Sequence, residues 1–126
     1  MMDVIAKGTN ELYPTDILFQ TPYWAQVKSQ MGMAPMAFDI HSSETWGDVL
    51  VLIKNHCGHK LALVPQGPEH APAEDVYGQY LEDLSLALAD RLDPDVAFIR
   101  YDLPWKSLYA EEMHQKGWSA FPEARI

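Results

Sequence analysis

The sequence predicts an α/β fold in which a mixed β-sheet is flanked by helices. Segments of strand-like apolar character alternate with two segments whose apolar residues recur at helical spacing. The apolar runs at 47–55 and 60–64 are separated only by a short turn, which predicts an antiparallel hairpin. A further helix then separates this hairpin from the apolar run at 96–101, and such a crossover is typical of a mixed α/β sheet.

The N-terminal part of the chain leads into the first helix. Residues 1–14 are mixed in character and are expected to be a lead-in with little structure. Residues 16–20 are expected to form a short first strand, and residues 22–31 the first helix. Thr21 suits the N-cap because its hydroxyl can accept a free backbone N–H. Pro22 suits the first helical position, where its missing N–H costs nothing.

The spacing within this helix predicts which side it buries. Trp24, Val27 and Met31 fall on one face at helical spacing and are expected to pack on the sheet. Gly32 can end the helix in a left-handed conformation. Lys28 lies one turn after Trp24, at the edge of that face, where its stem can cover apolar surface while its charge stays over a groove.

The middle of the chain is rich in strand signals. Residues 35–41 and the near-continuous apolar run within 47–55 predict two strands, the second of them central in the sheet. Residues 55–59 form the turn to the strand at 60–64, with a loop longer than the tightest kind. Prolines and a glycine then stop that strand and begin a loop.

The C-terminal part predicts two more helices. Tyr77, Leu81, Leu84 and Leu88 share a face of a well-defined helix. Residues 96–101 are expected to form a buried strand. A last helix is expected to begin at 104 or 105 and to end at Gly117, and a further extended segment begins at 118–121.

Composition excludes several classes of protein. The formal net charge of −9 disfavours non-specific binding to nucleic acid, and no DNA partner is expected. Cys57 is the single cysteine, so no internal disulfide can form. No apolar run is long enough to span a membrane, and the N-terminus lacks the pattern of a signal peptide. A cytoplasmic location is expected.

The first motif that could carry chemistry consists of Gln20, Trp24 and Lys28. These residues form the pattern Gln-x-x-x-Trp-x-x-x-Lys across the start of the first helix. A positioned lysine can recognise phosphate as a point charge. The alternative is an ordinary solvated surface lysine.

The second motif is the turn at 64–68, which contains Gly67 between two prolines. A turn of this kind before a helix can present backbone N–H groups to an anion. The two prolines remove two donors, which argues against a pyrophosphate loop for acetyl-CoA. The alternative is a turn that only shapes the chain.

The third motif spans residues 98–105. Arg100 lies in the predicted buried strand and needs a partner there, and Asp102 is expected on the same side of the strand. A structural ion pair between the two is one interpretation. The other is a role for Arg100 in the groove where strands 60–64 and 96–101 diverge.

The segment His56-Cys57-Gly58-His59 could suggest a metal cluster or a nucleophile pair. Its spacing fits no usual zinc pattern, so a turn is the better interpretation. No metal site and no cofactor are expected, and no residue stands out as a general base.

The three motifs, in this order, resemble the FemABX family of peptidyltransferases over about Ile17 to Trp118. That family transfers an amino acid from aminoacyl-tRNA to a peptidoglycan precursor, and each half of its proteins is similar to the N-acetyltransferase (GNAT) fold. The resemblance implies that residues 15–126 are an N-terminal GNAT-like subdomain that is incomplete at its C-terminus. The rest of the active site would then belong to a second half.

The resemblance also implies partners and site residues. Lys28, Trp24, Gly67 and Arg100 would bind a substrate such as UDP-MurNAc-pentapeptide or a lipid II-type precursor. Aminoacyl-tRNA would bind mainly through the second half, and no catalytic residue is assigned in this chain. Two alternatives stay open: a non-catalytic binding module that could form a homodimer through an open sheet edge, and a small acyl-CoA acyltransferase.

Overall fold

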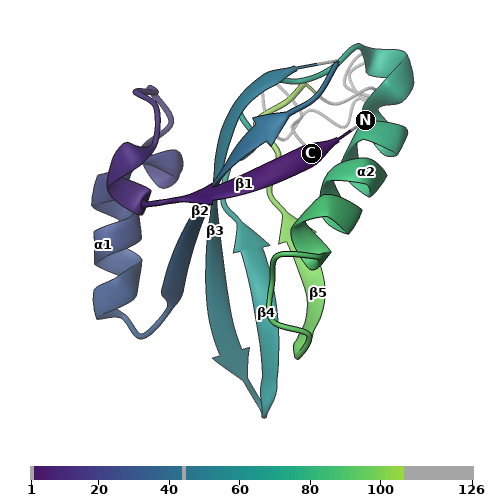
Figure 1. The fold of residues 1–126 in the computed structure, drawn as a ribbon. Coiled ribbons are helices and arrows are strands. Elements are labelled where there is room, and N and C mark those ends of the chain that lie inside the picture. The colour runs from purple at the N-terminus through teal and green to yellow at the C-terminus, as the bar shows by residue number, and fades with distance from the viewer. Residues whose placement is uncertain (1, 44, 107–126) are drawn as a thin grey trace, which may run out of the picture.

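A computed structural model gives the fold and describes residues 2–43 and 45–106. In this part of the chain, a five-stranded mixed sheet carries one α-helix on each face (Figure 1). The predicted α/β class, with a mixed sheet and flanking helices, is confirmed. The strands are β1 (Asp3–Lys7), β2 (Ala34–His41), β3 (Trp46–His56), β4 (His59–Val64) and β5 (Val96–Tyr101). The helices are α1 (Pro22–Gln30) and α2 (Tyr77–Ala89).

The sheet order follows the chain order, β1-β2-β3-β4-β5. The first three pairs are antiparallel and join neighbours in sequence. Only β4 and β5 are parallel, because α2 returns the chain to the same end of the sheet before β5 begins.

Alternation along the strands divides the core into two layers. Val49 and Val51 of β3 pack on the α2 side, whereas Leu50 and Leu52 pack on the α1 side. All four are at most 2 % exposed, which explains why this segment reads as a continuous apolar run. The α2-side layer is the larger one, and Leu84 and Leu88 of α2 are fully buried in it.

The prediction that residues 1–14 have little structure is wrong. Asp3–Lys7 is strand β1, which pairs with β2 so that Val4 lies opposite Ile40. A 3₁₀ turn follows at Thr9–Glu11. Only Val4 of this strand is fully buried. The sequence of β1 therefore has almost no alternation of apolar and polar residues from which a strand could be predicted.

The prediction of a strand at 16–20 is also wrong. Leu18–Gln20 forms a 3₁₀ turn closed by the bond from the N–H of Gln20 to the carbonyl of Ile17, 3.0 Å long. The side chain of Gln20 points inward and is 4 % exposed. This segment therefore serves as the entry to α1 rather than as an element of the sheet.

Helix α1 begins as predicted but buries a different side chain. The Thr21 hydroxyl accepts the N–H of Trp24 at 3.2 Å, and Gly32 has a φ of +93° after the helix. Met31 is 65 % exposed, so its predicted place on the buried face is wrong. The small Ala25, 1 % exposed, takes that role and lets the helix backbone approach the sheet closely.

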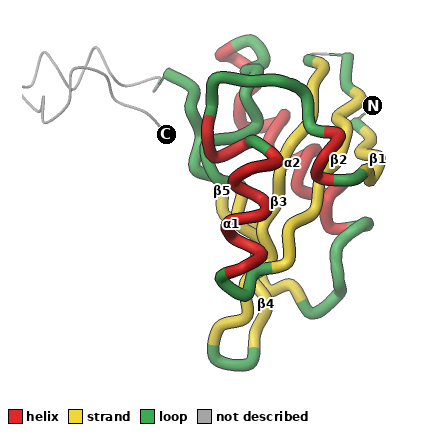
Figure 2. Tube along the Cα trace, turned by 90° about the vertical axis from the view of Figure 1, so that its left-hand side faces the viewer, coloured by secondary structure: helices red, strands yellow, loops and turns green. Residues whose placement is uncertain are grey.

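The hairpin between β3 and β4 is tighter than predicted. His56 pairs with His59, so Cys57 and Gly58 alone form the loop. Their φ angles of +52° and +82° are those of a type I′ turn, whose twist suits two antiparallel strands. The tip of this hairpin projects at one end of the molecule (Figures 1 and 2).

Strand β5 has the predicted bounds but not the predicted burial. It is an edge strand of the described sheet, and Ala97, Phe98 and Arg100 are exposed. A last helix does not begin where it was expected, since Trp105 lies in a bend and Lys106 in an isolated bridge. The predicted helix end at Gly117 and the extended segment at 118–121 lie outside the described residues.

Candidate functional site

Gln20, the first residue of the first motif, ties three segments of the chain together. Its Oε1 accepts the N–H of Leu50 at 2.7 Å, and its Nε2 donates to the carbonyl of Leu50 at 3.3 Å. Nε2 also donates to the carbonyl of Pro65 at 2.7 Å. Strand β4 pairs with β3 only from Leu52 onward, so the side-chain amide of Gln20 takes the place of a neighbouring strand beside Leu50.

Gly67, from the second motif, is in direct contact with this amide. A Cβ atom at position 67 would lie 2.7 Å from Cδ and Nε2 of Gln20, so the hydrogen-bonded amide of Gln20 would have to shift. The N–H of Gly67 donates to the carbonyl of Asp102 at 3.1 Å. This N–H is therefore not offered to an anion, and the geometry favours the interpretation in which the turn shapes the chain.

The third motif closes on the same turn. The N–H of Asp102 donates to the carbonyl of Val64 at 3.0 Å, and its Oδ2 accepts from Nε2 of Gln66 at 2.9 Å. The indole N–H of Trp105, which is 3 % exposed, donates to the carbonyl of Pro68 at 2.7 Å. The three sequence motifs, whose outermost residues are 85 positions apart, thus form one hydrogen-bonded unit.

Lys28 extends from the last turn of α1 over an aromatic surface. Its Nζ lies 4.9 Å from the centroid of the Trp24 ring, which in turn packs at 4.6 Å on Phe19. The apolar support predicted for this lysine is present in the Trp24 ring, over which the ammonium group lies. Within residues 2–43 and 45–106, no carboxylate lies at ion-pair distance from Lys28.

Arg100 differs from its prediction. It is exposed on β5, and in the described part of the chain it makes no ion pair with Asp102, so the predicted structural pair is wrong. Asp102 bonds to Gln66 instead. The guanidinium needs no buried partner because β5 lies at the edge of the described sheet rather than in its interior.

Leu63 relates the positions of the two cationic residues. Like Trp24, it packs against the α1-side cluster, and it lines a shallow hollow of about 180 Å³ together with Arg100 and Asp102. Lys28 and Arg100 therefore border the same face of the sheet, the one that carries α1. We call the surface formed by Trp24, Lys28, Leu63 and Arg100 the cationic face.

A second polar cluster, which no sequence motif indicated, lies at the far edge of the sheet. The Nζ of Lys7 lies 2.7 Å from a carboxylate oxygen of Asp39 and 2.7 Å from one of Asp48, and 3.8 Å from the centroid of the Tyr13 ring. Burial lowers the pKa of Lys7, but its bonds to both aspartates outweigh that effect and the pKa is raised. Two carboxylates thus share one ammonium group, which anchors β1 to β2 and β3.

Two buried tyrosines have perturbed acidities. Burial raises the pKa of Tyr101 to about 12, while its bond of 2.8 Å to the Ser85 hydroxyl opposes the shift. Burial likewise raises the pKa of Tyr80, which bonds to Thr45 at 2.7 Å. Both stay protonated near neutral pH, so neither offers a base to a reaction.

The comparisons with known proteins identify no relative. The chain matches no protein-family model, and no curated protein or solved structure matches it. No helix among the described residues is long and apolar enough to cross a membrane. The chemistry of the cationic face must therefore be argued from its own residues. Its two cations, which pair with no carboxylate among the described residues, lie beside aromatic and apolar surface and can bind an anion attached to a less polar group.

Proposed function

We propose that this chain binds the phosphates of a peptidoglycan precursor on its cationic face, as the N-terminal part of an aminoacyltransferase of the FemABX type. The observation that carries the proposal is the pair of cations, Lys28 and Arg100, that border one sheet face without carboxylate partners among the described residues. The ligand would be UDP-MurNAc-pentapeptide or a lipid II-type precursor, and either carries a diphosphate.

The fold is compatible with this proposal. Four antiparallel strands followed by a helix crossover to a parallel fifth strand agree with the order expected for a GNAT-like half. The three motifs that suggested the family also form one unit around Gln20, Gly67 and Asp102. Such a unit would fix the relative positions of α1, which carries Lys28, and β5, which carries Arg100.

Each residue of the cationic face has a role in this proposal. Lys28 would attract the diphosphate as a point charge, while Trp24 holds the lysine stem and limits its motion. Arg100 would contact the same ligand from the hollow beside Leu63, which Arg100 lines together with Asp102. Gly67 would act indirectly, by leaving room for Gln20.

The transfer reaction itself would need groups from the second half that the resemblance implies. There the amine of the precursor peptide would attack the carbonyl carbon of the aminoacyl ester. The tRNA hydroxyl would leave, and the proton lost by the amine would pass to it or to solvent. Aminoacyl-tRNA would bind through that half, because a net charge of −9 disfavours a broad tRNA-binding surface here.

A calorimetric titration of the chain with UDP-MurNAc-pentapeptide tests the proposal. Replacing Lys28 or Arg100 with alanine should weaken binding about tenfold or more, because each change removes a charge-assisted contact of about 1.5–3 kcal/mol. Arg91→Ala is the matched control: it removes the same charge from a residue that is 51 % exposed and lies near Asp3 instead. Equal weakening in all three variants would indicate a general charge effect and contradict the proposal.

Acetyl-CoA serves as a second ligand in the same experiment. Binding of acetyl-CoA but not of the precursor would favour a small acyl-CoA acyltransferase. The turn at 64–68 argues against that outcome. The N–H of Gly67 is already bonded to the carbonyl of Asp102, and the two prolines of the turn have no N–H to offer. If neither ligand binds, a non-catalytic interaction module becomes the better interpretation.

A further inference from the structure

Three segments of the chain meet around a small hollow at the start of β3. Tyr13 comes from the segment after β1, Trp46 and Asp48 belong to β3, and Glu69 and His70 lie in the loop after β4. The hollow has a volume of about 40 Å³. We call it the aromatic hollow, and it shares no residue with the cationic face.

Aromatic rings form the walls of this hollow. The ring centroid of Trp46 lies 6.2 Å from that of Tyr13, at an interplanar angle of 65°, and 5.2 Å from that of His70. Gly47 makes room for the histidine: its φ is +144°, and a Cβ atom there would lie 3.3 Å from Cδ2 of His70. Trp46 is nevertheless 70 % exposed, so much of its indole ring stays open to a ligand.

The charge around the aromatic hollow is negative. Asp48, which lines it, shares the ammonium group of Lys7 with Asp39, so two carboxylates face one cation. Glu69 also lines it and pairs with no lysine or arginine among the described residues. Its neighbour at 3.6 Å is His70, which is charged only when protonated. Excess negative charge beside ring faces favours a cation and disfavours an anion.

Lys7 shows how this surface can hold an ammonium group. Its Nζ lies 3.8 Å from the centroid of the Tyr13 ring and 2.7 Å from a carboxylate oxygen of Asp48. Trp46 lines the same hollow as Asp48, and in the described part of the chain no lysine or arginine lies over its ring. A cation from outside the chain could therefore use Trp46 as Lys7 uses Tyr13.

We propose that the aromatic hollow binds the methylated ammonium group of a small organic cation. The carboxylates that line it already accept hydrogen bonds: Oδ2 of Asp48 from Lys7 and from the N–H of Tyr13, and Oε1 of Glu69 from the Thr15 hydroxyl. A primary ammonium group has three donors that need acceptors. A fully methylated one has none, and ring faces and nearby negative charge are sufficient to hold it.

The size of the aromatic hollow agrees with this class of ligand. A volume of about 40 Å³ corresponds to roughly three water molecules. That is enough for one compact head group but not for a sugar ring or a nucleobase. The inference does not depend on the proposed function, because the ligand and the residues differ.

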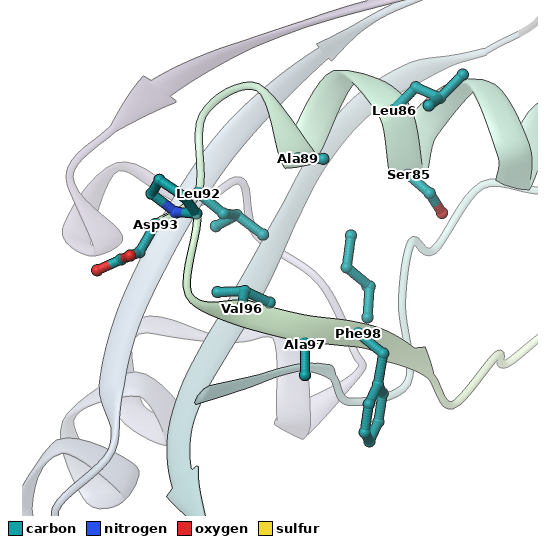
Figure 3. Close-up of a pocket in the computed structure, with 10 residues that line it drawn as sticks. Ser85, Leu86, Ala89, Leu92, Asp93, Val96, Ala97 and Phe98 are labelled. Carbon is teal, nitrogen blue, oxygen red and sulfur yellow. The ribbon is translucent and has the colours of Figure 1, made fainter. Parts of the chain in front are cut away.

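A larger hollow elsewhere carries no unbalanced charge among its lining residues. It has a volume of about 370 Å³ between the end of α2 and β5, and Figure 3 shows Ser85 and Ala89 of α2 above it and Val96 below it. Its carboxylate, Asp93, is paired with the ammonium group of Lys60 at 2.6 Å. Its lining therefore specifies no ligand chemistry, whereas the rings and charge of the aromatic hollow do.

Titration of the isotope-labelled chain with tetramethylammonium chloride, followed by nuclear magnetic resonance, tests the inference. The backbone amide signals of Gly47 and His70 and the indole N–H signal of Trp46 should shift and saturate, with a dissociation constant in the millimolar range. Sodium chloride at the same concentrations is the reference for ionic strength. tert-Butanol, a neutral molecule of similar size, and methylammonium should each bind about threefold more weakly or worse.

Two variants locate the binding site. Trp46→Leu removes the ring face, and Glu69→Gln removes a charge while keeping an acceptor for Thr15. Each should raise the dissociation constant about threefold or more, as expected for a contact of about 0.5–1 kcal/mol or slightly above. The matched controls are Tyr23→Leu, an exposed aromatic on α1, and Glu82→Gln, an exposed carboxylate on α2, and both should bind as the unmodified chain does.

Unchanged amide signals in the rest of the sheet must show that the variants keep the fold. The inference is wrong if tetramethylammonium produces no saturable shifts around Trp46, or only those that sodium chloride produces. It is equally wrong if tert-butanol or methylammonium binds as tightly, or if the control variants weaken binding as much as Trp46→Leu and Glu69→Gln. Failure here leaves precursor binding by the cationic face untouched, because that is measured with another ligand and with variants of Lys28 and Arg100.

Discussion

Replacement of Gln20 with leucine tests the structural unit that joins the three motifs. Leucine has a similar volume and suits a site that is 4 % exposed, so packing changes little. What is lost is the amide, which bonds to the N–H and carbonyl of Leu50 and to the carbonyl of Pro65. The variant therefore isolates the contribution of these hydrogen bonds to stability.

The expected loss follows from the groups left unpaired. The N–H of Leu50 and the carbonyl of Pro65 each lose a bond of 2.7 Å, and the 3.3 Å bond to the Leu50 carbonyl is weaker. A buried backbone group without a partner costs about 1–3 kcal/mol. The two strong bonds together predict a loss of about 2–5 kcal/mol, a large share of the 5–15 kcal/mol typical of a domain.

Urea unfolding followed by far-ultraviolet circular dichroism measures this loss. The transition midpoint of Gln20→Leu should fall by about 1 M or more with an unchanged slope. The matched control is Gln79→Leu, where an exposed amide bonds only to Asp83 one turn away, and its effect should stay within about 0.5 kcal/mol. Equal midpoints for the two variants would refute the claim that Gln20 holds the motifs together.

Three further changes test other parts of the structure. Gly67→Ala should destabilise the fold by about 1–3 kcal/mol through its clash with Gln20. The same change should cost less when it is made in the Gln20→Ala variant, which lacks the clashing amide, and urea unfolding of the single and double variants measures the difference. The pKa of Tyr101 is raised to about 12 in the folded protein, from near 10 in the unfolded chain. Its contribution to the free energy of unfolding is therefore fully present below about pH 10 and is lost as the pH rises toward 12. Tyr101→Phe should reduce this alkaline loss in unfolding measured across that range. Lys7→Met should cost about 3 kcal/mol by removing the cation that Asp39 and Asp48 share, measured by thermal unfolding.

Each of these changes has a matched control in the chain. Gly78→Ala lies in α2 with open space around its Cβ and should be neutral or stabilising. Tyr23→Phe changes a tyrosine that is 65 % exposed and should leave the alkaline loss intact. Lys54→Met removes an exposed lysine and should alter the melting temperature little. A control that behaves like its test variant would contradict the corresponding explanation.

The elements that bury continuous apolar surface could be predicted from the sequence. Strand β3 is a continuous apolar run because both of its faces are buried, and helix α2 has a strong helical period because its buried side chains are large and regularly spaced. Strand β1 was missed because only Val4 is fully buried in it. The short strand expected at 16–20 was wrong because the buried residue there, Gln20, is polar and serves as a hydrogen-bonding partner rather than as part of a ladder.

The candidate site could be predicted only in part. The cap at Thr21 and the stacking of Lys28 on Trp24 depend on neighbours within one turn, which the spacing reveals. The bond between Gln20 and Leu50 joins residues 30 positions apart, and no local pattern indicates it. The exposure of Arg100 depends on the position of β5 at the edge of the described sheet, which is a property of the whole topology.

The central claim is that the cationic face binds the diphosphate of a wall precursor, and amide chemical-shift mapping tests it most directly. The labelled chain would be titrated with UDP-MurNAc-pentapeptide while its backbone amide signals are followed. The largest shifts are expected near Lys28, Leu63 and Arg100, on the α1 side of the sheet. Shifts confined to the α2 side, or no shifts at saturating precursor, would contradict it.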